Sequence, residues 1–162
     1  MRLSENTAVV VADALNVTAS FATAGNGANM KNYNRCRVIL LITASGDAAA
    51  TVTLLQGSSG TAVSTSLAFT EYLKNEDMET NLATWTKVSA STATALAGAS
   101  GNYGYIWEIK ADQLDTDTFG SENTYVRCNV TATGGNVTAA ALIYELYEPR
   151  DMKGADGAPS AS

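Results

Sequence analysis

The sequence predicts an all-β protein, an antiparallel β-sandwich of jelly-roll-like type with extended N- and C-terminal arms. Three observations support this prediction. Short runs of alternating apolar and polar residues recur about every 10 to 15 residues, and turn-forming residues separate them. Thr, Val and aromatic residues, which favour strands, are frequent within these runs. No stretch shows the sustained 3.6-residue periodicity that predicts a surface helix.

The first half of the chain contains four predicted strands. Residues 15–21 alternate in character and follow an N-terminal arm at 1–14. Residues 35–43, RCRVILLIT, are the most apolar run and are predicted to form a central strand that is buried on both faces. Residues 51–56 and 61–69 flank a Ser-Ser-Gly turn sequence and are predicted to pair as a hairpin.

The second half begins with a less regular region. Residues 71–81 are polar and acidic, and we expect a short helix or a long loop there. Residues 84–88 are strand-like, whereas the small residues of 91–102 predict a loop. Residues 103–110 alternate Tyr, Tyr, Trp and Ile with other residues, which predicts a strand with an aromatic face. Residues 111–122 are expected to be an acidic connection.

The clearest pairing signal lies in residues 123–148. Two alternating runs flank Gly134 and Gly135, and a two-residue glycine turn is typical of a hairpin. In the register that this turn sets, Val126 faces Ile143 across the pair. The predicted core face contains Val126, Cys128, Val130, Val137, Ala139, Ala141 and Ile143. The other face ends in an apolar patch that is expected to meet another segment or subunit, formed by Tyr125, Leu142, Tyr144 and Leu146.

These segments predict one sandwich domain at residues 15–148. The chain has 162 residues, which is enough for one domain with a proper core. Residues 149–162 form a predicted tail, because their composition offers little to bury. We expect the arms at 1–14 and 149–162 to contact neighbouring subunits.

The charge distribution disfavours nucleic acid and membrane partners. The net charge is −6, whereas domains that bind a phosphate backbone are usually basic. The sequence shows no signal peptide and no run near the ~18 apolar residues of a membrane span. The N-terminal third is more basic, which suits an acidic neighbour or is scattered solvated charge. Its charged residues include Arg2, Lys31, Arg35 and Arg37 against Glu5 and Asp13.

Two cysteines, Cys36 and Cys128, each lie in a predicted strand among apolar neighbours. We expect two buried, reduced thiols that act as small hydrophobic residues. A disulfide remains an alternative if the two strands lie side by side.

Candidate catalytic and metal-binding groups are sparse. The chain has no histidine, which removes the usual nucleophilic triads and proton shuttles. Asp115, Asp117 and Glu122 suggest a calcium loop, but Phe119 occupies a ligand position, so an acidic solvated loop is favoured. We predict no metal, no cofactor and no catalysis.

Two further groups of residues were weighed as sites. Glu108 and Glu145 are both on predicted strands, where a glycosidase would need two carboxylates in a cleft; strand glutamates more often face solvent. An aromatic set resembles a sugar-stacking platform, although aromatics on an alternating strand are more often core or interface. This set contains Trp85, Tyr103, Tyr105 and Trp107.

The order of several segments resembles small virion proteins of tailed bacteriophages. The segments are VILLIT, TVTLLQGSSG, WTKV, YVRCNVTATGGNV and YEPRD. Many such proteins carry a YVR strand followed by a Thr-rich hairpin with a Gly turn near the C-terminus. The resemblance covers roughly residues 33 to 150 and contains no diagnostic motif. It implies a β-sandwich head component, often a decoration or cement subunit on the capsid lattice, and no catalytic residues.

We therefore predict a structural virion protein of a tailed bacteriophage, a decoration subunit that binds and stabilises the capsid lattice. Its predicted partners are the major capsid protein and copies of itself, as a dimer or trimer, after assembly in the host cytoplasm. The alternatives are a tail-tube or head-completion (connector) subunit, and a carbohydrate-binding module, the one reading that implies a glycan. The predicted interface residues are Tyr125, Leu142, Tyr144, Leu146, Arg35, Arg37, Pro149, Arg150 and Met152.

Overall fold

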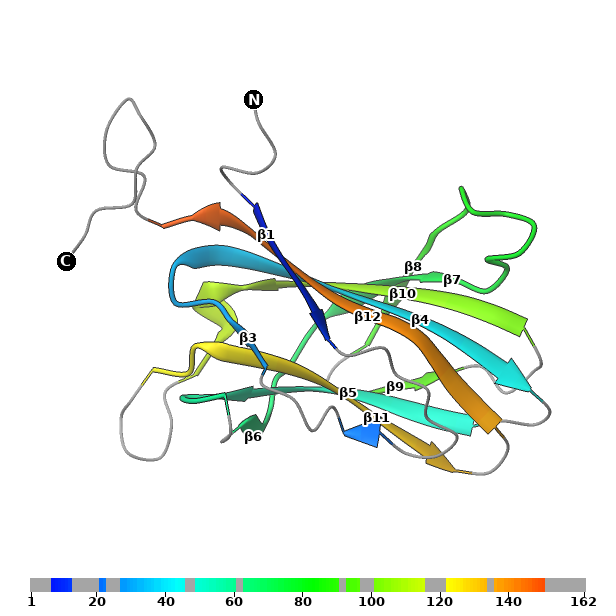
Figure 1. Ribbon diagram of the computed structural model, residues 1–162, viewed down its shortest axis with the longest axis horizontal. Coiled ribbons are helices and arrows are strands. Elements are labelled where there is room, and N and C mark those ends of the chain that lie inside the picture. The colour runs from blue at the N-terminus through cyan, green and yellow to red at the C-terminus, as the bar shows by residue number, and fades with distance from the viewer. Residues whose placement is uncertain are drawn as a thin grey trace.

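The computed structural model is a two-layer antiparallel β-sandwich (Figure 1). The structure describes residues 7–12, 21–22, 27–45, 49–60, 63–90, 93–96, 101–115, 122–133 and 136–150.

One layer, sheet A, contains six strands in the order β1-β12-β4-β10-β7-β8. Their bounds are β1 Thr7–Ala12, β12 Asn136–Pro149, β4 Tyr33–Ser45, β10 Gly101–Lys110, β7 Glu71–Asn75 and β8 Thr86–Ser89. The other layer, sheet B, follows the path β2-β11-β5-β6, with β3 also paired to β11 and β9 also paired to β5. Their bounds are β2 Phe21–Ala22, β11 Tyr125–Thr133, β5 Ala49–Gly57, β6 Val63–Ser66, β3 Ala28–Asn29 and β9 Ala93–Leu96. A single 3₁₀ turn, η1, spans Ala111–Gln113.

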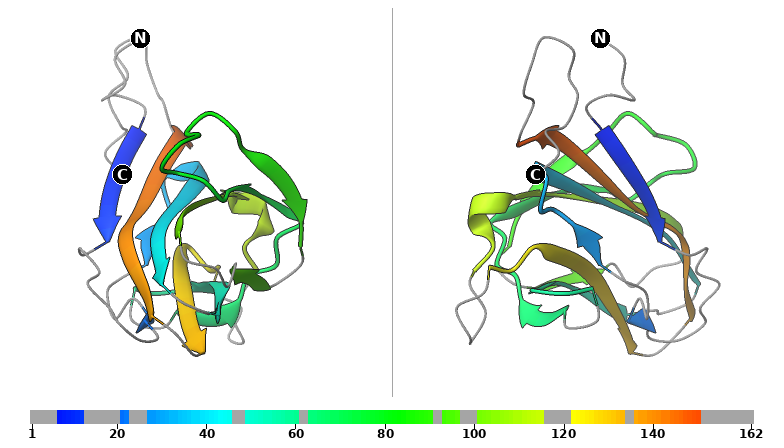
Figure 2. Two further views of the ribbon diagram at one scale, coloured as in Figure 1. Left: turned by 90° about the vertical axis from the view of Figure 1, so that its right-hand side faces the viewer. Right: turned by 60° about the vertical axis from the view of Figure 1, so that its left-hand side comes forward.

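The strand pairs are nested in the way that defines a jelly roll. β1 pairs with β12, β2 and β3 pair with β11, β4 pairs with β10, and β5 pairs with β9, all antiparallel. This long folded ribbon is rolled into two sheets by the β12–β4 and β11–β5 pairings. β6, β7 and β8 lie between β5 and β9 in the chain and widen the two sheets (Figures 1 and 2). The predicted jelly-roll-like sandwich is confirmed.

The core lies between the sheets and follows the period-two alternation of each strand. On β4 the even-numbered residues from Cys36 to Ile42 are buried, and on β10 the odd-numbered residues from Tyr103 to Ile109 are buried. The aromatic face predicted for residues 103–110 packs inward. Its Trp107 ring stacks on Tyr72 at 5.7 Å between centroids and meets Phe69 edge-on at 6.3 Å.

The predicted hairpin at residues 123–148 is wrong in its pairing. β11 lies in sheet B, where Val126 pairs with Gln56, whereas β12 lies in sheet A, where Ile143 pairs with Ile39. β11 ends at Thr133 in sheet B and β12 begins at Asn136 in sheet A, and Gly134 and Gly135 are outside the described residues.

A bulge in β12 explains why the core face predicted for its C-terminal part is wrong. Ala139 pairs with Ile42 and Ala141 pairs with Leu41, so one extra residue lies between these pairs. The bulge shifts the alternation by one, since two residues of the bulged strand oppose one of its partner. Leu142, Tyr144 and Leu146 are consequently buried, whereas Ile143 is only half-buried.

Several other predicted segments differ from the structure. Residues 7–12, expected within an arm, form β1, and residues 71–75, expected as helix or loop, form β7. The loop predicted at 91–102 contains β9. β4 is central, but its odd-numbered face is half-buried and not core. The predicted 51–56 and 61–69 hairpin is confirmed by the β5–β6 pairing.

Both cysteines are buried free thiols, as predicted. Cys36 is on β4 in sheet A and Cys128 is on β11 in sheet B, so they occupy opposite walls of the core. Burial raises the pKa of each thiol to about 12, and the charge of Glu145 adds to this effect at Cys36. Such thiols are poor nucleophiles and fit a packing role.

Candidate interaction surface

The outer face of sheet A carries a row of aliphatic side chains that crosses four strands. Ile143 pairs with Ile39, Ile39 pairs with Ile106, and Ile106 pairs with Leu73, so one residue from each of β12, β4, β10 and β7 lies in line. The three isoleucines are half-buried and Leu73 is 39% exposed. We call these four residues the apolar row. Sheet faces turned to water normally carry polar residues, so this row is a candidate contact surface.

Directly beside the apolar row lies a set of ion pairs. Arg37 pairs in register with Glu145 on β12 and Glu108 on β10, and its Nη1 donates to Glu145 Oε2 at 2.8 Å. Arg35, two residues earlier on β4, donates through Nη1 to Glu108 and through Nε to Glu148 Oε2, the latter at 3.0 Å. We call these five residues the ion-pair ladder.

The ladder is held by more than charge. The Arg37 guanidinium lies 5.3 Å from the centre of the Tyr147 ring, a distance at which a cation and an aromatic face attract. The ion pairs with Glu108 and Glu148 raise the pKa of Arg35 above its usual value. Pairs as exposed as these contribute little to folding, so the ladder mainly determines where charges lie on the surface.

The apolar row and the ladder border a cleft of about 720 Å³. Ile39, Ile106 and Leu73 of the apolar row line it. Charges of both signs surround them, and the charged lining residues are Arg37, Glu71, Lys87, Glu108, Lys110 and Asp112. An apolar floor with mixed charges at its rim resembles the composition of protein–protein contact sites, in which an apolar centre is bordered by polar groups.

The segment between β7 and β8 covers the end of this face opposite the ladder. The backbone N–H of Met78 donates to the Asn102 carbonyl at 3.1 Å, and the Asn102 side chain donates to Glu79 at 2.6 Å. A Cβ at Gly104 would stand 2.8 Å from the Trp85 ring and 2.9 Å from the Met78 sulfur. Gly104 therefore permits this segment to pack closely over β10.

Three of the predicted interface residues are in the core. Leu142, Tyr144 and Leu146 are at most 4% exposed, because the bulge in β12 turns them inward. The Tyr144 hydroxyl accepts a hydrogen bond from the backbone N–H of Cys128 at 2.8 Å, so it links the two sheets. That N–H lies between the stretches of β11 that pair with β3 and with β2.

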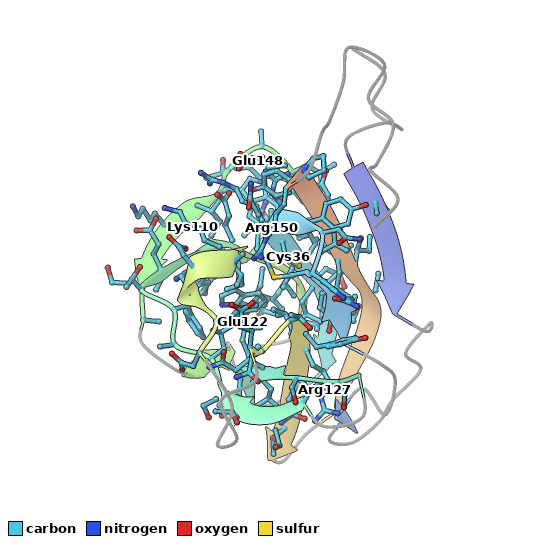
Figure 3. The ribbon with its side chains drawn as sticks, turned by 90° about the vertical axis from the view of Figure 1, so that its left-hand side faces the viewer. Cys36, Lys110, Glu122, Arg127, Glu148 and Arg150 are labelled. Carbon is cyan, nitrogen blue, oxygen red and sulfur yellow. The ribbon has the colours of Figure 1, made fainter. Side chains whose placement is uncertain are left out.

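The remaining predicted interface residues are dispersed. Arg35 and Arg37 belong to the ladder, whereas Tyr125 is on sheet B, half-buried, with its hydroxyl 3.0 Å from Asn29 Nδ2. Pro149 ends β12 opposite Tyr33, and the Arg150 N–H donates to Asn32 at 2.9 Å. Met152 is outside the described residues. In Figure 3 Glu148 and Arg150 lie above Arg127, which belongs to β11 of sheet B.

The other sequence-based candidates do not form sites. Trp107 and Tyr105 are fully buried, which removes the predicted sugar-stacking platform. The Asp115 carboxylate accepts from the buried Gln56 side chain at 2.9 Å, while Asp117 is outside the described residues. Within the described part of the chain, no three His, Cys, Asp or Glu side chains gather as metal ligands. Nor does this part contain a helix of the length and apolar character that a membrane span requires.

Sequence reasoning missed the apolar row. The sequence does contain one indication of it: in VILLIT, residues 38–43, aliphatic residues occupy positions on both faces of the strand. This was interpreted as burial on both faces, as in a parallel sheet. In the structure one face is core and the other belongs to the apolar row.

Comparisons with known proteins find only distant similarity in fold. The chain is 13% identical to a chain of infectious bursal disease virus Gx strain, with a TM-score of 0.43, over 90% of this chain and 33% of that one. It is 7% identical to BiXyn10A CBM1 in its apo form, with a TM-score of 0.37, over 90% and 83%. It is 9% identical to the Eiger TNF of S. frugiperda, with a TM-score of 0.34, over 91% and 88%.

The chain thus spans about a third of the length of the virus chain. No family model matches it, and no curated protein matches it. These similarities concern the fold alone, and the jelly-roll assignment rests on the strand pairing described above.

Proposed function

We propose that this chain is a structural virion protein of a tailed bacteriophage, a decoration subunit that binds the outside of the capsid lattice. Its partners are the major capsid protein and further copies of itself, and it joins the particle in the host cytoplasm. It acts by contact area and has no catalytic role. The segment resemblance of residues 33–150 supports this proposal, and the jelly roll is a frequent architecture of virion subunits.

The outer face of sheet A is the observation that carries the proposal. The apolar row offers aliphatic surface on a rigid sheet, and covering it removes that surface from water at about 25 cal/mol per Å². The ladder beside it presents charges in fixed positions, which favours one docking orientation over others. Weak single contacts are sufficient on a lattice, because many copies bind at once.

The carboxylates on this face fit the proposed role better than catalysis. Glu108 and Glu145 lie on opposite sides of β4, and each is bound to an arginine of that strand. The buried positions of Trp107 and Tyr105 argue against glycan binding through those rings.

A tail-tube or head-completion (connector) subunit remains the alternative within the same class. It differs from a decoration subunit in copy number per particle. Quantitative mass spectrometry of purified particles measures this chain against the major capsid protein. A copy number per particle comparable to that of the capsid protein supports decoration. A copy number that corresponds to a single ring supports the alternative, and absence from particles contradicts both.

A binding experiment tests the role of the sheet A face. Undecorated capsids are mixed with wild-type protein or with single-lysine variants, and co-sedimenting protein is quantified. We expect Ile106→Lys to weaken binding about tenfold or more, since it places an unpaired charge in the apolar row. The matched control is Thr131→Lys on the exposed outer face of sheet B, which should bind as wild type. Equal binding by both variants would contradict docking through sheet A.

A further inference from the structure

The strands at the sheet edges differ in how well they are protected against pairing with another chain. An edge strand exposes unpaired N–H and C=O groups, and proteins usually shorten such strands or charge them. In sheet B the edge positions are held by β2 and β3, with two residues each, and by β6 and β9, with four each. In sheet A the β8 edge has four residues and carries Lys87, which is paired with Glu71.

β1 is the exception. It has six residues, TAVVVA, with no charge, no proline and no glycine. Among the described residues it pairs only with β12, and no other described strand pairs with its second edge. Val9 is 60% exposed, more than most large apolar side chains of the described chain. A strand of this composition has high β-propensity and none of the usual protective features.

We propose that β1 pairs with β1 of a second copy of this chain, antiparallel about a two-fold axis, so that sheet A continues across both copies. A two-fold contact places the same surface on both sides, so a charge close to the axis meets the same charge of the other copy and is repelled. β1 has none, on a protein whose net charge is −6. The edge is therefore a place where two copies meet with little repulsion.

The neighbouring row supports the same conclusion. Val9 pairs in register with Glu145, and Glu145 is already bound to Arg37. The charge that lies in register with Val9 is thus balanced by Arg37 within each copy. This inference is independent of capsid binding, because it concerns the free protein.

The test is sedimentation equilibrium of the full chain over a concentration series. Wild-type protein should show a monomer–dimer equilibrium. Val9→Lys should weaken it about tenfold or more, because two lysines then meet across the axis, whereas in each copy the lysine remains next to Glu145. Val9→Thr keeps the edge uncharged and should dimerise as wild type. Thr131→Lys adds the same charge on the exposed outer face of sheet B and should also leave the dimer intact.

Charge complementation locates the contact. Val9→Glu alone should be monomeric, and an equimolar mixture of Val9→Lys and Val9→Glu should regain dimers, with far-UV circular dichroism establishing that both variants are folded. A monomeric wild-type protein over the whole series would overturn the inference. It would equally be overturned by dimerisation of Val9→Lys as strong as wild type, or by a mixture no more dimeric than its components.

Discussion

The two outer faces of the sandwich differ sharply although both belong to antiparallel sheets of one domain. Sheet A carries the apolar row and the ion-pair ladder. Sheet B carries mainly short polar side chains on its two central strands, where Thr51 pairs with Thr131 and Thr53 pairs with Asn129. Among the described residues, no ion pair lies on sheet B. One face is thus suited to water and the other to contact with a partner.

The inner faces, by contrast, are both apolar. Each sheet supplies alternating apolar residues, and each supplies one buried cysteine. The difference between the sheets therefore does not arise from the core. It arises from the outward-facing residues of each strand, which can vary without loss of the fold.

The largest expected effect tests which side chains of β12 point into the core. Leu142→Ala should lower the free energy of unfolding by about 2–5 kcal/mol, because it leaves a cavity in the core. The matched variant Ile143→Ala, one residue later on the outer face, should cost about 1 kcal/mol or less. Urea denaturation measures both. A larger cost at Ile143 would contradict the bulge and with it the position of the apolar row.

A second variant tests the link between the sheets. Tyr144→Phe should cost about 1–3 kcal/mol, since it leaves the buried N–H of Cys128 without its hydroxyl acceptor. Tyr125→Phe removes a hydroxyl bonded to Asn29 at the surface and should cost less. Thermal or chemical denaturation of the two variants in parallel gives the comparison, and equal costs would count against the cross-sheet bond.

The burial of one cysteine thiol in each sheet predicts that stability depends on pH. The folded-state pKa of each thiol is raised to about 12 from 9.0, so the folded protein retains protons that the unfolded chain loses. The thiols' contribution is complete below pH 9 and declines above it, by about 1 kcal/mol for each thiol at pH 10. Denaturation at several pH values measures this against Cys36→Ala/Cys128→Ala. A difference between the two proteins that does not change from pH 8 to pH 10 would contradict burial of the thiols.

The smallest effect concerns the ladder. Arg37→Ala should lower stability by about 1 kcal/mol or less, because both partners are partly exposed. Its cost should exceed that of Lys74→Ala, which removes a surface ion pair without an aromatic partner. Denaturation at low and high salt separates the contributions, since salt screens the ion pairs. A cost of several kcal/mol would show that the ladder is a folding element and not a surface feature.

Much of the fold was predictable from strand alternation, while the pairing of the strands was not. The buried residues of β10 and β11, such as Trp107 and Val130, follow directly from period two. The alternation says nothing of which strands pair, so it predicts a hairpin of β11 and β12, whereas these strands lie in different sheets. The bulge before Ala141 is also invisible in the sequence, because alanines fit both phases.

The candidate site was predictable only in part. Arg35 and Arg37 were predictable as contact residues because they belong to the more basic N-terminal third of an acidic chain. Their partners Glu108, Glu145 and Glu148 come from distant segments, and only the strand order brings them together. The apolar row has the same origin: each of its residues lies on a different strand, and no local pattern marks the set.

Radical footprinting of the protein, free and bound to capsids, tests whether the protein docks through the outer face of sheet A. It measures the solvent accessibility of individual side chains and so separates the two faces of one sheet. We expect the side chains of Leu73, Ile106 and Ile39 to become less accessible to solvent on particles. The accessibility of Leu55, half-buried on the outer face of sheet B, should not change. Protection of Leu55 with no change in the apolar row would contradict docking through sheet A.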